Sequence, residues 1–240
     1  MNLAATAPAQ SLVQRAKEAV TGHIRDNGLR VGDTLPGEGH FAEKLGVSRA
    51  VMREAFGALA ALGLIDVANG RKPRVGALDG AVMATSLDHA ISTAQVSVSE
   101  VWDVRRTIEV RTAALAAANA SKAEADHIMA LADAMAAEDE PHDHVTDRDI
   151  EFHQAIARAS GNALFEQIVM SFAPLMKVAV PQAWGTRRTD DEKQTIFDRH
   201  RALAKAIADR DPVAASHYMD MHFDESVGAL LQQLPASELP

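Results

Sequence analysis

The apolar positions between Leu35 and Leu64 recur with the spacing of two short helices that are separated by a tight turn. Gly46 ends the first helix, and Ser48 is a good N-cap for the second. The positions that we expect to be buried are Phe41, Ala42 and Leu45, then Val51, Ala55, Leu59 and Leu62. The pattern therefore predicts a pair of packed helices over this stretch.

The polar face of the second helix carries Ser48, Arg49 and Arg53 near its N-terminal end. A helix that presents Ser and Arg in its first turns, behind a bracing helix, is typical of the recognition helix of a helix-turn-helix. Arginine at such positions can bridge the acceptors of guanine in the major groove of double-stranded DNA. An ordinary helical hairpin with a solvated Arg pair has the same pattern, so the segment that follows decides between the two.

A β-hairpin is predicted directly after the helix pair. Residues 64–67 form one extended run, Asn69-Gly70 is a strong turn signal, and residues 71–75 return as a second run. The returning run is cationic, with Arg71, Lys72 and Arg74 suited to phosphates or to the minor groove. Because fold and charge agree, we interpret the stretch as a winged helix-turn-helix that binds DNA.

Four motifs in this region resemble those of GntR-type regulators: LP-x-E, A-x-x-LGVSR, REA and L-x-x-LGLI. They cover about the first third of the chain. The resemblance implies that Arg49, Arg53 and the wing, which is the hairpin predicted over residues 64–75, contact the operator. The family has Arg directly after the Glu of LP-x-E, whereas Gly39 stands there in this sequence, followed by His40. One DNA contact is therefore expected to be missing, and the operator is expected to differ from the commonest one.

Helical signals dominate from residue 83 onward. Three capping boxes, opened by Ser97, Ser121 and Thr189, and the Asp211-Pro212 pair predict helix starts near residues 98, 122, 190 and 212. Further helices fit residues 83–95, 144–160 and 162–180, which gives about seven. Pro141 is expected to end the helix that begins at residue 122, and Pro181 with Gly185 is expected to mark a break.

The predicted fold is mainly α, with an N-terminal winged helix-turn-helix and a C-terminal all-helical bundle. We place the DNA-binding domain at residues 1–76, a linker at 77–82 and the bundle at 83–234. The bundle is the expected site of metal and effector binding and of dimerisation.

Charge divides the 240-residue chain in the same place. Residues 1–78 carry 10 Lys/Arg and 7 Asp/Glu, whereas residues 79–240 carry 14 and 26. A basic module joined to an acidic one suits a regulator of which only one part meets phosphates. The sequence has no cysteine, which excludes disulfides and thiolate metal sites. It shows no apolar run of membrane-spanning length and no signal-peptide pattern, so we expect a cytoplasmic protein without a membrane partner.

One carboxylate and three imidazoles are predicted to point inward from three helices of the bundle. Asp149 and His153 lie four residues apart on one face, and His200 and His222 lie on the apolar stripes of two later helices. An unpaired imidazole is costly on such a face, and imidazole with carboxylate suits zinc, nickel, manganese or iron(II). Ordinary hydrogen-bonded core histidines have the same spacing, so both interpretations stay open.

The second domain resembles the FCD-type ligand-binding domain of the FadR subfamily of GntR regulators. The motifs that carry the resemblance are VWDVRRTIE, D-x-x-x-H followed by GN, H-x-x-L-x-x-A-I and M-x-x-H, over roughly residues 83–230. The resemblance implies one divalent ion, zinc before nickel, manganese or iron, held by Asp149, His153, His200 and His222.

The same resemblance implies a small carboxylate effector: a sugar acid, a hydroxy acid or a dicarboxylate. Arg105 is then expected to point into a cavity and grip the effector carboxylate, although it could instead pair with Glu109 along its own helix. Asn162 either lines the pocket or caps the next helix, and we expect the cap. The predicted function is a metabolite-responsive transcription regulator, a repressor that binds a pseudo-palindromic operator as a homodimer.

Two other functions are weighed against this one. An all-helical metal-dependent hydrolase fused to a DNA-binding module would need an open metal position and a general base. No nucleophile–base pair beyond the metal ligands stands out in the sequence. A regulator with a purely structural ion is the third possibility, and chelation would then unfold its second domain with or without effector.

Overall fold

The computed structural model describes residues 11–136, 142–185 and 189–226, and the chain divides into two compact units, Met1–Val82 and Met83–Pro240. The expected domain end at residue 234 lies outside the described residues. Helix α4 (Gly80–Ser92) begins inside the predicted linker, so residues 80–82 are helical.

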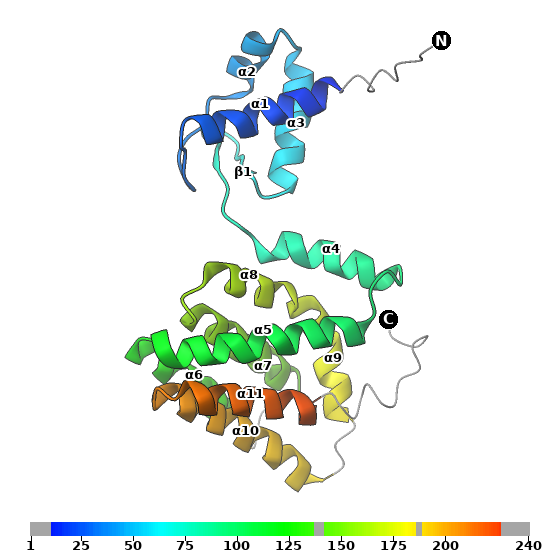
Figure 1. Ribbon diagram of the computed structural model, residues 1–240. Coiled ribbons are helices and arrows are strands. Elements are labelled where there is room, and N and C mark those ends of the chain that lie inside the picture. Colours follow the sequence, from blue (N-terminus) through cyan, green and yellow to red (C-terminus); the bar gives the residue numbers. More distant parts are fainter. Residues whose placement is uncertain (1–10, 137–141, 186–188, 227–240) are drawn as a thin grey trace, which may run out of the picture. The chain divides into compact units, whose positions relative to one another are not determined.

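The first unit consists of three helices and a short hairpin (Figure 1): α1 (Leu12–Asp26), α2 (Glu38–Leu45), α3 (Arg49–Ala61), β1 (Ile65–Asp66) and β2 (Arg74–Val75). Its core joins side chains of all three helices and β1, including Val20, Phe41 and Phe56. Gly46 closes α2 in the left-handed conformation with φ 66°, which favours glycine. The hydroxyl of Ser48 accepts a hydrogen bond from Val51 N at the start of α3. The helix-turn-helix prediction is confirmed.

The buried face of α3 is rotated from the predicted one. Met52 and Phe56 are buried beside Ala55 and Leu59, whereas Val51 is half-buried and Leu62 is 54% exposed. Leu62 is the C-cap residue, where the chain leaves the helix, so it does not continue the apolar stripe into the core. The prediction that Leu62 is buried was therefore wrong.

The wing is a minimal antiparallel hairpin with Ile65 opposite Val75 and Asp66 opposite Arg74. An isolated bridge from Thr34 to Arg74 adds a third piece of extended chain. Gly76 is required at the base of the wing, because a Cβ there would lie 2.0 Å from the carbonyl oxygen of Gly63. The predicted hairpin is confirmed, with strands shorter than the two runs.

Eight helices are described in the second unit: α4, α5 (Val98–Asn119), α6 (Lys122–Met135), α7 (His142–Ala159), α8 (Ala163–Ser171), α9 (Ala173–Gly185), α10 (Asp190–Ala208) and α11 (Pro212–Ser226). The helix starts predicted near residues 98, 122, 190 and 212 are confirmed. The first three carry the complete capping box, with both reciprocal hydrogen bonds present.

Three predicted boundaries were wrong. Helix α6 ends at Met135, before Pro141. The helix predicted over 162–180 is interrupted at Phe172, where α8 and α9 meet at 55°. Pro181 lies inside α9, so of the two residues expected to mark the break it is Gly185 that ends the helix. Proline there removes one backbone donor, and the buried neighbours Val180 and Ala183 keep the turn packed.

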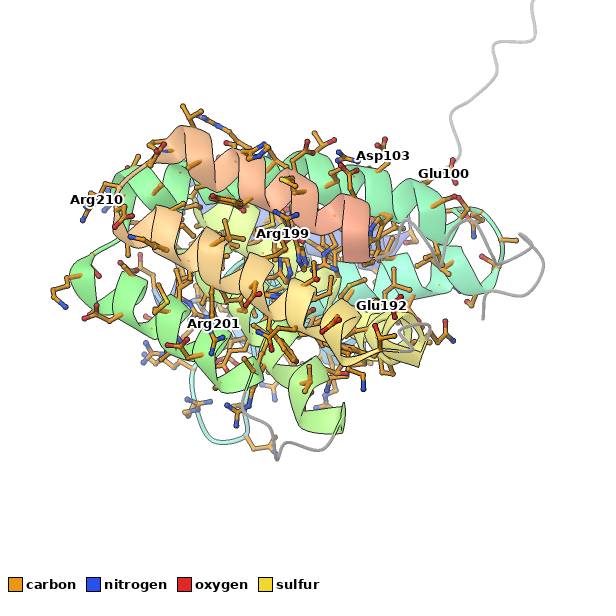
Figure 2. The ribbon with its side chains drawn as sticks, turned by 90° about the horizontal axis from the view of Figure 1, so that it is seen from below. Glu100, Asp103, Glu192, Arg199, Arg201 and Arg210 are labelled. Carbon is orange, nitrogen blue, oxygen red and sulfur yellow. The ribbon has the colours of Figure 1, made fainter. Side chains whose placement is uncertain are left out.

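Helix α5 lies at the centre of the second unit and packs against α7, α8, α10 and α11 (Figure 1). Ala113, Ala116 and Ala117 are fully buried on it, and their small side chains let the neighbouring helices approach closely. The turn between α10 and α11 is tied to the end of α5 by Arg210 (Figure 2), whose guanidinium donates to the carbonyls of Ala118 and Ala120 over 3.2 and 2.6 Å.

No single helix in the described ranges is long and apolar enough to cross a membrane; only the bent pair α8–α9 meets that test when the two are taken together.

Candidate metal centre and DNA-binding surface

The structure brings the four predicted metal ligands into one buried cluster. Asp149 and His153 come from α7, His200 from α10 and His222 from α11, and each residue is 2–8% exposed. One ligand atom of each lies within 4.8 Å of the other three. Three helices that are distant in sequence therefore present one carboxylate and three imidazoles to a common point.

The contacts inside the cluster are close. His200 Nε2 lies 3.1 Å from Asp149 Oδ1, and His153 Nε2 lies 3.9 Å from the same oxygen. His153 Nε2 and His222 Nε2 are 3.2 Å apart. Phe152 packs edge-on against His153 and His200, and Phe223 against His153 and His222. The polar atoms thus face one another, and phenylalanine rings pack against the three imidazoles.

Hydrogen bonds outside the cluster fix which nitrogen of two imidazoles faces inward. His200 Nδ1 lies 2.8 Å from the carbonyl oxygen of Ile196, which can only accept, so Nδ1 carries the proton. His153 Nδ1 likewise contacts the carboxylate of Glu109. Both Nε2 atoms then turn a lone pair toward the cluster. Imidazoles held in this way are the usual arrangement for ligands of a divalent ion, so the residues present fit such an ion.

Electrostatics keep this cluster in the binding form. Burial lowers the pKa of His222 well below its ordinary value, and the neighbouring His200 and His153 lower it further, so its imidazole stays neutral. Burial alone would raise the pKa of Asp149, but its contacts with His200, His153 and His222 outweigh it, and the pKa is lowered. His222 Nδ1 is buried without a hydrogen-bond partner. Neutral imidazole and ionised carboxylate are the forms that bind metal.

Arg105 is 3% exposed and forms a buried ion pair with Glu109, so the intrahelical pairing weighed from the sequence is present. Its guanidinium carbon lies 5.0 Å from the ring centre of Trp102 and 5.3 Å from that of Phe223. This places Arg105 beside the cluster, because Phe223 also contacts two of its imidazoles.

Glu109 is the residue that the sequence interpretation missed as a part of this site. It is fully buried and touches both Arg105 and His153. Burial alone would raise the pKa of Glu109, but the charge of Arg105 and the hydrogen bond from His153 Nδ1 outweigh it, so the pKa is lowered and the carboxylate is ionised. The sequence contained one signal: Glu109 shares a helix face with Trp102, Ala113 and Ala116, where a charge needs a partner.

Asn162 is the N-cap of α8, and its side-chain oxygen accepts hydrogen bonds from Leu164 N and Phe165 N. The capping interpretation of Asn162 is confirmed. That use of its oxygen leaves only the amide group for any contact with an effector.

The predicted DNA contacts of the first unit lie on exposed positions of α3 and the wing: Ser48, Arg49, Arg53, Arg71, Lys72 and Arg74. Arg53 Nε lies 3.8 Å from Glu38, and Arg71 lies 4.0 Å from Asp66, so both side chains are loosely held. Arg74 is more constrained, because it donates to the carbonyl of Gly32 over 2.9 Å. A Cβ at Gly39 would lie 3.9 Å from the Arg49 guanidinium, so the residue that replaces the family's arginine borders a predicted DNA contact.

Both units match known families. Residues 12–75 match the bacterial regulatory proteins of the gntR family, and residues 100–225 match the FCD domain. The Glc operon transcriptional activator of Escherichia coli (strain K12) is 30% identical over 204 residues, which cover 82% of this chain and 80% of the relative. The Galactonate operon transcriptional repressor of the same strain is 26% identical over 190 residues, covering 77% and 81%.

Among solved structures, Streptococcus agalactiae GntR is 24% identical, with a TM-score of 0.63, and the match covers 90% of this chain and 99% of that one. At this level of identity the likeness shows a shared fold.

Proposed function

The chain belongs to the GntR family of bacterial regulatory proteins and carries an FCD domain, and from that premise we propose that a small organic acid, bound beside a divalent ion in the second unit, controls its affinity for operator DNA. A DNA-binding transcription regulator is what the family establishes, and the matched relatives are regulators rather than enzymes. The alternative of a metal-dependent hydrolase is therefore set aside.

The observation that carries the metal part is the inward convergence of Asp149, His153, His200 and His222 in a buried core. These four residues would hold the ion, and zinc is our first choice, with nickel, manganese or iron as alternatives for this ligand set. When bound, the ion supplies a Lewis-acidic anchor for a carboxylate oxygen.

Arg105 is the second contact that we assign to the effector. Its guanidinium already pairs with Glu109, and planar guanidinium groups carry five N–H donors, so an effector carboxylate can share it. The proposed class is a sugar acid, a hydroxy acid or a dicarboxylate, and a relative named for a galactonate operon is consistent with the first of these. Asn162 is a weaker candidate, because its oxygen caps α8.

In the first unit, Ser48, Arg49 and Arg53 would contact base edges and the backbone from α3, while Arg71, Lys72 and Arg74 would contact phosphates or the minor groove from the wing. A single winged helix recognises only a short half-site, so we propose a homodimer on a pseudo-palindromic operator in the cytoplasm. The FCD domain also supports placement in the FadR subfamily. We propose repression, and deletion of the gene should then raise transcription from the operator in a reporter assay.

Elemental analysis of the purified protein tests the metal assignment. Wild type should retain about one divalent ion per chain, and His153→Ala, His200→Ala and His222→Ala should each lose most of it, because each removes a ligand. His127→Ala is the matched control, since His127 is 48% exposed on α6 and pairs with Glu151 over 3.8 Å. If the wild type contained no metal after expression in metal-replete medium, the metal assignment would be wrong and the three histidines would be ordinary core residues.

A thermal-shift screen of small carboxylates with Zn²⁺ present tests the effector assignment. A ligand that binds only the folded state raises the melting temperature. A carboxylate that raises the melting temperature should also change the affinity of the wild type for operator DNA, and should leave the affinity of Arg105→Met unchanged. If chelation alone unfolds the second unit and no carboxylate shifts melting or DNA binding, the ion is structural and the effector assignment is wrong.

A further inference from the structure

One carboxylate in the second unit connects α5 to the metal cluster. Glu109 is fully buried; one of its oxygens contacts Arg105 Nε, and the other contacts His153 Nδ1. Arg105 and Glu109 belong to α5, whereas His153 belongs to α7. The carboxylate therefore lies between the Arg105 guanidinium and the Nδ1 side of the His153 imidazole, the side opposite the cluster.

Arg105 is held firmly enough to orient its partner. The rings of Trp102 and Phe223 lie 5.0 and 5.3 Å from its guanidinium carbon, and Met176 Sδ lies against Nη1. A cation over aromatic faces in a desolvated core is an attractive arrangement, so the guanidinium has little reason to leave it. The Glu109 carboxylate is thereby fixed in position and in charge.

A carboxylate behind an imidazole determines how that imidazole can bind. An ionised carboxylate only accepts, so the facing Nδ1 must donate and Nε2 must offer its lone pair to the other side. His153 Nε2 is the atom that faces Asp149 and His222, at 3.9 and 3.2 Å. Partners of this kind fix the tautomer and the ring orientation and raise ligand basicity, and their loss commonly costs 10–100-fold in metal affinity.

We propose that Glu109 is a positioning residue of the metal centre, which holds His153 in its metal-binding tautomer while Arg105 supplies the compensating charge. This inference rests on the proposed metal site and adds a residue that does not touch the ion. The competing explanation is that the carboxylate only ties α5 to α7, in which case its removal would lower stability and leave metal affinity unchanged.

The first test compares Glu109→Gln with the matched control Thr112→Val in Zn²⁺ competition titrations against a chelator. Thr112 is also fully buried on α5, and its hydroxyl donates to the Glu109 carbonyl over 2.9 Å, so its loss disturbs the same helix without touching His153. We expect Glu109→Gln to bind Zn²⁺ about 10–100-fold more weakly than wild type. Thr112→Val should bind Zn²⁺ as tightly as wild type, because it keeps the carboxylate that faces His153.

The absorption spectrum of the Co²⁺-loaded protein separates the two explanations. If Glu109 only tied α5 to α7, its replacement would leave the Co²⁺ absorption bands unchanged. The ligand-field bands should shift in Glu109→Gln, because the orientation and basicity of one ligand change, and should coincide with wild type in Thr112→Val. Zn²⁺ affinity and Co²⁺ bands that are both unchanged in Glu109→Gln would overturn the proposal while leaving the four-ligand site intact. A wild type that binds no Zn²⁺ would instead overturn the metal site itself.

Glu109→Gln leaves Arg105 as an unpaired buried cation and could prevent folding. The double variant Arg105→Met/Glu109→Leu removes both charges, a replacement that buried ion pairs commonly tolerate. It should fold and show the same 10–100-fold loss of Zn²⁺ affinity, since His153 has lost its acceptor. Wild-type Zn²⁺ affinity in the folded double variant would show that His153 needs no partner and would refute the proposal.

Discussion

Replacing Arg53 by alanine should separate DNA recognition from folding. The Arg53 side chain is 78% exposed, and its contact with Glu38 is an ion pair of 3.8 Å at the surface. Exposed pairs of this kind contribute about 0–1 kcal/mol, so the melting temperature should hardly change. A base contact made by arginine contributes about 1–3 kcal/mol, which corresponds to a loss of about 5–150-fold in affinity for one half-site.

The assay is a gel-shift titration on a sequence selected from a random DNA library, with melting curves for each variant. Glu38→Gln frees Arg53 from its ion pair and should bind specific DNA no more weakly than wild type. Arg201→Ala removes the same charge from α10, where Arg201 pairs with Asp133 over 2.9 Å, and should leave DNA affinity unchanged. If Arg53→Ala keeps full affinity and base preference, the assignment of α3 as the recognition helix is wrong.

Four further predictions follow from the two units. Lys72→Ala should weaken binding to all DNA sequences alike and reduce the slope of log affinity against log salt by about 1; an unchanged slope would remove Lys72 from the DNA contacts. Phe56→Ala, at 1% exposure, should lower the free energy of unfolding by about 3–5 kcal/mol in urea titrations, and a loss below about 1 kcal/mol would contradict its place in the core. In the metal-free protein, burial holds the pKa of His222 well below its usual range, so below pH ~6.5 the unfolded chain takes up a proton that the folded chain does not. The free energy of unfolding should therefore fall by up to about 1.4 kcal/mol for each pH unit below that value. Denaturant titrations in which the free energy of unfolding stays constant between pH 7 and 5 would contradict this. Sedimentation should show a dimer at micromolar concentration, and a monomer both on and off DNA would exclude the symmetric operator.

Local signals explain why the first unit could be predicted from its sequence. Gly46 and Ser48 mark the end of one helix and the start of the next by backbone conformation and capping, which depend on few neighbours. The rotated face of α3 could not be predicted in this way. Both Val51 and Met52 are apolar, and only the packing of α1 and α2 decides that Met52 is buried.

The helix boundaries of the second unit show the same limit. Capping boxes fixed the starts of α5, α6 and α10, because each is a local pair of hydrogen bonds. The break at Phe172 is followed by Pro174 in the first turn of α9, a signal that the prediction of one helix over 162–180 did not use, whereas Pro181 lies inside α9, which continues to Gly185. Tertiary packing decides the second case, since Val180 is buried in the core of the second unit.

The ligand cluster could be predicted in part. Helical spacing places Asp149, His153, His200 and His222 on inward faces, but their convergence within 4.8 Å depends on how α7, α10 and α11 pack. Glu109 was missed because an Arg and a Glu four residues apart are most often a solvated surface pair. Only the third partner, His153, distinguishes this pair from an ordinary one, and it lies 44 residues away in sequence.

The charges in the core of the second unit support the binding of a divalent ion and an organic-acid effector at the same site. Among the described residues, the buried ionised groups there are Arg105, Glu109 and Asp149, and the pKa shifts keep both carboxylates ionised. With neutral imidazoles, these three groups leave one uncompensated negative charge, which is costly in a buried interior. A divalent ion reverses that charge to one positive, and a bound carboxylate then neutralises it. The same balance gives no reason for a neutral or cationic effector, so it favours organic acids over sugars and amines as the ligands of this site.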